Sequence, residues 1–180
     1  MTVASQQYAS ALFDVSLKEG KLESVRHDFS EVIKAIALVE NFEDFIENSK
    51  IPLEERKAVV EKTFSGTDRL LLNLLRILTD KKRFILIDEI YEDFLTLYDE
   101  NHNQARVTVE SVYKLSSEEL DQLGQIFIDK TGYEKLLITN EINEDLIGGV
   151  RVLIGSKVYD GSVKSQLDGI KNQFKEHTNS

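Results

Sequence analysis

Hydrophobic residues in the first hundred positions recur every three or four residues, the spacing of helices that bury one face. The clearest run lies within residues 21–40, where six apolar positions stay in phase. Gly20 and Ser65-Gly66 interrupt the pattern, and Pro52 stands where a helix would begin. The pattern predicts helices over residues 5–19, 21–40, 42–48, 52–64, 68–80 and 83–101.

Two of these predicted helices are more apolar than one core-facing stripe requires. The helix over 68–80 has apolar residues at seven of the nine positions 70–78, so we expect neighbours to bury it on most sides, at the centre of a bundle. The helix over 5–19 is also apolar beyond one stripe. Such a surplus on adjacent helices can form a groove for a partner's amphipathic helix, and the alternative is that both helices are internal.

From Ala105 the apolar spacing changes to every second residue, which is typical of strands with one buried face. Ser116 and Glu119 form a capping-box pattern that predicts a helix start, and Thr131-Gly132 predicts its end. The predicted order is a strand from 105, a helix from 116, strands over 136–142, 150–154 and 158–160, and a final helix from 163.

These elements predict a mainly α protein with two domains. Residues 1–104 would form an N-terminal six-helix bundle, and residues 105–180 a small α/β C-terminal domain with a short mixed sheet. No Pro/Gly/Ser-rich linker marks the boundary near Asn103, so a helix end could join the two parts.

The stretch from Leu146 to Val163 holds four of the nine glycines and raises the question of phosphate binding. A phosphate loop needs a lysine directly after its last glycine, whereas Ser156 separates Gly155 from Lys157. The dinucleotide spacing Gly-x-Gly-x-x-Gly is absent as well. We therefore interpret these glycines as turn-forming residues.

Composition excludes several functional classes. The formal net charge of −10 argues against nucleic-acid binding, which needs a basic stripe to displace counterions. The absence of cysteine removes disulfides, thiolate metal sites and thiol catalysis. The sequence contains neither a membrane-spanning apolar window nor a signal-peptide pattern at its start, so we expect a cytosolic chain that meets a membrane only through partners.

Candidate catalytic groups are dispersed. The three histidines, His27, His102 and His177, lack a second histidine at helical spacing, and most carboxylate pairs stand at helix starts or on polar faces. We expect no catalytic, metal or cofactor site, which leaves protein binding. A helical adaptor of another cytosolic assembly and a small enzyme using dispersed carboxylates remain the alternatives.

Several short strings resemble one family along essentially all 180 residues. They are Tyr8-Ala9 with Ala11-Leu12-Phe13, Asn73-Leu74-Leu75 with Arg83, Ala105-Arg106-Val107, and the strings Leu146–Val150, Gly155–Val158 and Asp160–Val163. Together they resemble the delta subunit of bacterial F-type ATP synthase, the counterpart of the mitochondrial oligomycin-sensitivity-conferring protein. One departure is Lys81-Lys82, because relatives usually carry a glycine before the position of Arg83.

The resemblance implies a non-catalytic subunit of the peripheral stalk, at the cytoplasmic face of the cell membrane. The helical bundle would bind the N-terminal helix of an alpha subunit in a groove lined by Tyr8, Ala11, Leu12, Val15, Leu74, Ile77 and Leu78. The C-terminal domain would bind the b subunits through the strand-turn-helix region, at Val150, Val152, Val158, Val163, Leu167, Ile170 and Phe174.

Overall fold

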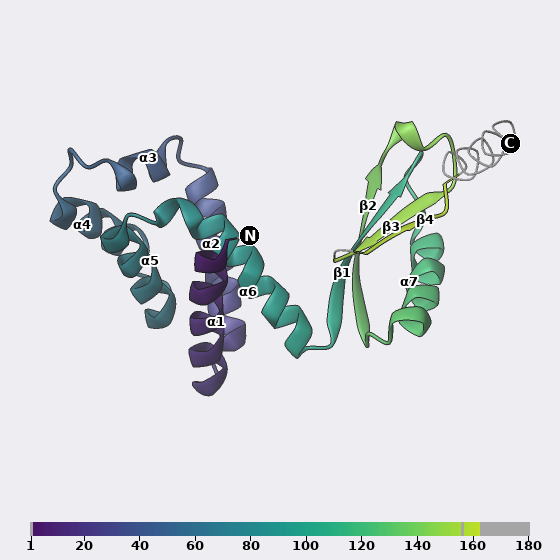
Figure 1. Ribbon diagram of the computed structural model, residues 1–180, viewed down its shortest axis with the longest axis horizontal. Helices are drawn as coiled ribbons and strands as arrows, with labels where there is room; N and C mark the ends of the chain where they lie inside the picture. Colours follow the sequence, from purple (N-terminus) through teal and green to yellow (C-terminus); the bar gives the residue numbers. More distant parts are fainter. Residues whose placement is uncertain (1, 156, 163–180) are drawn as a thin grey trace, which may run out of the picture. The chain divides into compact units, whose positions relative to one another are not determined.

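The computed structural model describes residues 2–155 and 157–162, which divide into two compact units. The helical unit spans Met1–Tyr98 and the C-terminal unit spans Asp99–Ser180. The division falls inside a helix, ahead of the predicted boundary at residue 104. The predicted fold class, mainly α with a small C-terminal mixed sheet, is confirmed (Figure 1).

Every helix that periodicity predicts in the first hundred residues is present, with shifts of a few residues at its ends. The predicted sixth helix begins with a 3-10 turn, η1, before it becomes α6. The elements are α1 (Val3–Lys18), α2 (Leu22–Ala37), α3 (Phe42–Glu47), α4 (Leu53–Thr63), α5 (Arg69–Lys81), η1 (Phe84–Leu86) and α6 (Ile87–Asn101).

Local sequence explains the helix ends. Thr2 and Ser5 exchange backbone and side-chain hydrogen bonds in a capping box that begins α1. The Asp68 side chain accepts a hydrogen bond from the Leu70 N–H group at the start of α5. Lys82 ends α5 in the left-handed conformation, at φ +52°, a position that glycine occupies at much lower cost. Lys82, which stands where relatives usually carry a glycine, is therefore a strained residue.

Aromatic rings form much of the core of the helical unit. Phe29 is fully buried and packs against Phe94 and Tyr91, with ring centroids 5.9 and 5.0 Å apart. Phe42 lies edge-on to both Phe64 and Phe84. Each fully buried phenylalanine contributes about 1.5–3 kcal/mol of transfer free energy, so these contacts join α2 to α6, and α3 to η1 and to the end of α4.

Neighbours bury or half-bury α5 on most of its sides, as predicted, and leave one flank exposed. Leu71, Leu75 and Leu78 are fully buried on one face. Ile77, by contrast, keeps 45% of its surface exposed, and Asn73 is also exposed. The phase of the leucines, rather than their number, decides how much of the helix the bundle covers.

The C-terminal unit is a four-stranded sheet with order β2-β1-β3-β4. Strands β1 and β2 are parallel and are joined through α7, whereas β1–β3 and β3–β4 are antiparallel. The final helix predicted from Val163 lies outside the described residues. The elements are β1 (Gln104–Ser111), α7 (Ser117–Thr131), β2 (Lys135–Ile142), a 3-10 turn η2 (Glu144–Leu146), β3 (Val150–Ile154) and β4 (Lys157–Asp160).

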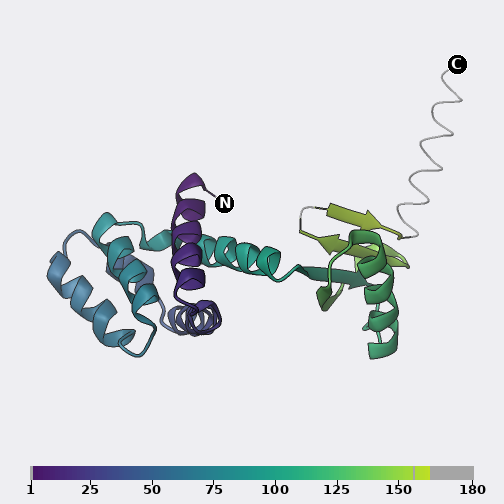
Figure 2. The same cartoon turned by 90° about the horizontal axis from the view of Figure 1, so that it is seen from below.

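Helix α7 lies along one face of this sheet (Figure 2). The alternate residues Val107 and Val109 are buried beneath it, together with Val152 of the neighbouring strand. Gly124, in the middle of α7, allows close packing because an added Cβ would lie 3.0 Å from the Ile138 Cδ1 atom. The other face of the sheet carries the intervening residues of each strand, many of them polar or charged.

Candidate docking surfaces

Helix α1 presents a stripe of small and apolar side chains beside its core-facing side. Ala4, Tyr8, Ala11 and Val15 follow one another at helical spacing. Ala4 and Tyr8 are half-buried, whereas Ala11 and Val15 are exposed. Helix α1 packs directly against α5, and Tyr8 of this stripe contacts Arg83 just after α5, so the stripe lies on the α5 side of α1.

Helix α5 contributes the second half of this surface. Arg76 forms an ion pair with Glu61 of α4 at 2.8 Å, which shows the side of α5 that faces α4. Leu70 and Ile77 lie on the opposite flank, half-buried and 45% exposed respectively. We call the set Ala4, Tyr8, Ala11, Val15, Leu70 and Ile77 the α1/α5 surface.

A polar contact closes one end of the α1/α5 surface. The guanidinium of Arg83, just after α5, donates a hydrogen bond of 3.2 Å to the Tyr8 hydroxyl. A shallow cavity of about 410 Å³ also runs along the outer side of α1 and has Ala11 in its lining. Ala11 therefore lies where a partner could approach α1 closely, because its methyl group leaves room for another backbone.

The structure divides the predicted alpha-binding residues into two groups. It buries Leu12, Leu74 and Leu78 in the core and leaves Tyr8, Ala11, Val15 and Ile77 at the surface. The buried leucines would support the surface from beneath without contacting a partner. Ala4 and Leu70 were not among the predicted site residues, although each continues the helical spacing of its stripe.

The C-terminal unit has an aromatic cavity of about 340 Å³ on the α7 side of its sheet. Phe127 of α7 and Tyr159 of β4 meet there edge to face, with ring centroids 5.1 Å apart. The Lys130 ammonium lies 4.5 Å from the centroid of the Tyr159 ring, a cation–π contact. Val150 and Val152, two of the predicted b-binding residues, complete the apolar lining.

The other predicted b-binding residues do not share this cavity. Val158 pairs with Leu153 and lies on the opposite face of the sheet, where it is 57% exposed. Val163, Leu167, Ile170 and Phe174 lie outside the described residues. The described part of the predicted set is thus divided between two faces, because adjacent residues of a strand point in opposite directions.

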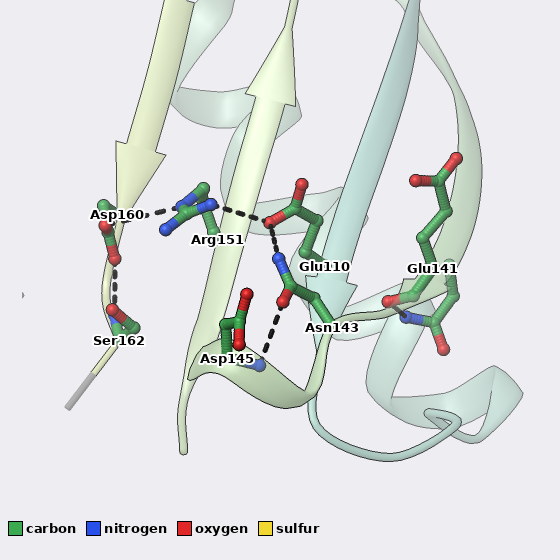
Figure 3. Close-up of polar contacts among 8 residues, drawn as sticks. Glu110, Glu141, Asn143, Asp145, Arg151, Asp160 and Ser162 are labelled. Carbon is green, nitrogen blue, oxygen red and sulfur yellow. Dashed lines mark hydrogen bonds and ion pairs between the residues drawn. The ribbon is translucent and has the colours of Figure 1, made fainter. Parts of the chain in front are cut away.

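A chain of ion pairs crosses the sheet face opposite α7 (Figure 3). Arg151 of β3 contacts Glu110 of β1 at 2.9 Å and Asp160 of β4 at 3.4 Å. The Asn143 side chain donates a further hydrogen bond of 2.9 Å to Glu110. Hydrogen bonds from Ser162 and the nearby Arg151 charge lower the pKa of Asp160. These contacts join three strands, so we interpret the network as structural.

The glycine-rich stretch forms two interlocked turns. Gly149 has φ +75°, and an added Cβ would lie 2.6 Å from the Gly161 carbonyl oxygen. The Gly161 N–H group donates to the Val150 carbonyl oxygen at 3.0 Å, and the Asp160 carboxylate accepts the Ser162 N–H group at 2.9 Å. This geometry agrees with turn formation, because close backbone approach is what requires glycine here.

Residues 2–155 and 157–162 are the ranges that the structure describes. In these ranges, no three His, Cys, Asp or Glu side chains are grouped so as to hold a metal ion. Within the same ranges, none of the helices has the length and apolar character needed to cross a bilayer. His27 and His102 are exposed, and His177 lies outside the described residues.

The fold and these surfaces define a two-unit, mainly helical protein whose prominent features suit contacts with other proteins. The family model "ATP synthase delta (OSCP) subunit" matches residues 4–174. The chain belongs to this family. It is accordingly a non-catalytic subunit of the peripheral stalk of an F1Fo ATP synthase.

Individual relatives agree along nearly the whole length. The chain is 47% identical over 174 residues to ATP synthase subunit delta of Macrococcus caseolyticus (strain JCSC5402), covering 97% of this chain and 98% of the relative. It is 37% identical to ATP synthase subunit delta of Staphylococcus carnosus (strain TM300), with the same coverage. A chain of the Toxoplasma gondii mitochondrial ATP synthase hexamer shares the fold, with TM-score 0.78, 21% identity and coverage of 97% of this chain and 98% of that chain.

Proposed function

We propose that this stator subunit connects two specific partners, one through each unit. The helical unit takes the N-terminal helix of an alpha subunit on the α1/α5 surface, and the C-terminal unit holds the end of the membrane-anchored b subunits. The observation that carries the proposal is the exposed apolar stripe along α1 and α5, which the bundle leaves uncovered. The chain would thereby be held at the cytoplasmic face of the cell membrane through its partners.

The α1/α5 surface has the composition that an amphipathic helix requires. Val15 and Ile77 expose 41% and 45% of their surfaces, and burying apolar area releases about 25 cal/mol per Å². Ala11 is small enough for a helix backbone to pass close by. Because Leu12 and Leu74 are only 6% exposed, the floor beneath these residues is already packed and would need little reorganisation on binding.

The aromatic cavity of the C-terminal unit is the corresponding feature for the b subunits. Its apolar lining of Phe127, Val150 and Val152 could receive an apolar side chain from the end of a coiled coil. Lys130, at its edge, would favour an acidic group beside that side chain. The cavity includes the two predicted b-binding valines on the α7 side of the sheet.

The mechanism is mechanical. A rotor that turns inside the catalytic head exerts torque on the head, which must be held still relative to the membrane part if proton flow is to drive ATP synthesis. A subunit with two separate attachments supplies this restraint. It needs affinity and stiffness at both surfaces and no reactive group, which agrees with a family of non-catalytic subunits.

Substituting Ala11→Asp tests the alpha-binding surface. The carboxylate would become buried and unpaired under the bound helix, which costs about 3 kcal/mol, or ~150-fold in affinity. Isothermal titration with a peptide of the alpha-subunit N-terminus measures the change. Ala58→Asp is the matched control, because Ala58 is an exposed alanine on α4, away from this surface, and the added charge is the same.

The expected result is a large loss of affinity in Ala11→Asp and little change in Ala58→Asp, with circular dichroism showing that both variants keep their helices. Equal affinity for the wild-type chain and Ala11→Asp would remove the assignment of the α1/α5 surface. Equal losses in both variants would show a general charge effect, which also contradicts a defined site.

A further inference from the structure

The helical unit has a second hollow, separate from the α1/α5 surface. It lies between the end of α2, the short helix α3 and the start of α6, and has a volume of about 470 Å³. Its floor includes Ile36 and Phe42, both buried in the core. Val39, at its edge, is 52% exposed, and the adjacent Leu38 is 86% exposed. The hollow therefore combines an apolar floor with exposed apolar side chains.

Carboxylates form the rest of the lining. Glu43, Asp44 and Asp88 all line the hollow, and the described lining residues include no Lys, Arg or His. Partial burial, and then the negative charges of Asp88, Glu47 and Asp44, raise the pKa of Glu43 above its ordinary value. Burial is the larger cause of this rise, and the neighbouring carboxylates add to it.

Stabilisation of the helix starts does not by itself explain why these carboxylates lie around the hollow. Glu43 and Asp44 stand in the first turn of α3 and Asp88 in the first turn of α6, where negative charge stabilises a helix. That benefit would lower the pKa of a carboxylate. Because the pKa of Glu43 is raised instead, its burial and the repulsion from its neighbours exceed the benefit. A cationic side chain would relieve this repulsion.

A metal ion does not match the arrangement. Among the described residues, no three carboxylates or histidines are grouped so as to ligate one ion, so the acidic groups here are spread along the rim. Spread charges above an apolar floor match a peptide segment whose cationic side chains are spaced along its backbone. The acidic net charge of the whole chain, −10, favours approach by a basic partner as well.

We propose that this hollow is a docking site for a basic amphipathic segment of another polypeptide. Its apolar side chains would cover the floor, and its Lys or Arg side chains would pair with the rim. We call the site the acidic hollow, formed by Ile36, Val39, Phe42, Glu43, Asp44 and Asp88. It goes beyond the proposed function, because it shares no residue with the α1/α5 surface or the aromatic cavity.

The probe is a 14-residue amphipathic helical peptide composed of leucine and lysine only, titrated into the full chain labelled for NMR. The test variant is the double substitution Glu43→Gln with Asp88→Asn. The matched control is Glu54→Gln with Glu55→Gln, which removes the same charge from the first turn of α4. A peptide with glutamate in place of every lysine controls for apolar binding alone.

We expect amide shifts centred on Val39 and Phe42, and affinity about three- to tenfold weaker in the Glu43/Asp88 variant, as for two partly exposed ion pairs. The Glu54/Glu55 control should bind like the wild-type chain, and the glutamate peptide should not bind. Shifts centred elsewhere, or equal losses in both variants, would overturn the proposal. The alpha-subunit peptide should bind the Glu43/Asp88 variant normally, so this test and that of the α1/α5 surface can fail independently.

Discussion

Replacing Gly149 by alanine tests whether close backbone approach, and not flexibility, explains the glycine-rich stretch. The new Cβ would lie 2.6 Å from the Gly161 carbonyl oxygen, well inside ordinary contact distance. Alanine at φ +75° costs about 1–2 kcal/mol by itself. Moving the Gly161 carbonyl away would also strain the 3.0 Å hydrogen bond from Gly161 to Val150, which is worth about 1 kcal/mol. The expected destabilisation of the C-terminal unit is about 2–4 kcal/mol.

Gly132→Ala is the matched control. Gly132 ends α7 at φ +79° in the same unit, but an added Cβ would meet nothing within 4 Å. It should therefore show only the conformational cost of the left-handed backbone, about 1–2 kcal/mol. Urea unfolding followed by the amide NMR signals of the sheet reports on this unit alone. Equal destabilisation by the two substitutions, or a smaller effect at Gly149, would refute the close-approach explanation.

Three further predictions concern residues in both units. Lys82→Gly should stabilise the helical unit by about 0.5–1 kcal/mol in thermal unfolding, because Lys82 has φ +52°, a conformation that glycine adopts at lower cost. The control Lys81→Gly should destabilise the unit, because Lys81 lies within α5, where glycine is unfavourable. Burial and the 2.5 Å hydrogen bond to Glu23 raise the pKa of Tyr98 in the folded chain. The contribution of Tyr98 to the free energy of unfolding should therefore be complete below pH ~10 and should fall as the pH rises through the higher folded-state pKa. Tyr98→Phe should make that fall less steep when unfolding by urea is measured between pH ~9 and ~12. Tyr159→Ser should weaken binding of a soluble b-subunit fragment in pull-down titrations, whereas Val158→Ser, on the opposite face of the sheet, should not. A loss of affinity in Val158→Ser alone would assign the b contact to the other face.

Local sequence signals predicted most of the elements because they depend on neighbouring residues. The capping box at Ser116 and Glu119 begins α7 as expected, and Gly132 ends it. The change to period two at Ala105 coincides with β1. These features depend on hydrogen bonds and side-chain spacing within one element, so the sequence contains them directly.

Tertiary arrangement was less predictable from the sequence. Leu12, Leu74 and Ile77 are all apolar members of the predicted groove, yet only packing decides that the first two are buried and Ile77 is exposed. Val158 and Tyr159 are adjacent, and the pairing of β4 with β3 alone determines which of them lies over the α7 side. The sequence indicated which residues could form the sites but not which face each residue occupies.

The central claim, that this chain holds the catalytic head to the membrane part, is tested most directly by coupling in membrane vesicles. The vesicles would be stripped of the chain and then given back the wild-type chain, Ala11→Asp or Ala58→Asp, with ATP-driven proton pumping measured alongside ATP hydrolysis. We predict that stripped vesicles lose pumping, that the wild-type chain and Ala58→Asp restore it, and that Ala11→Asp does not. Vesicles that pump fully without this chain would contradict the account.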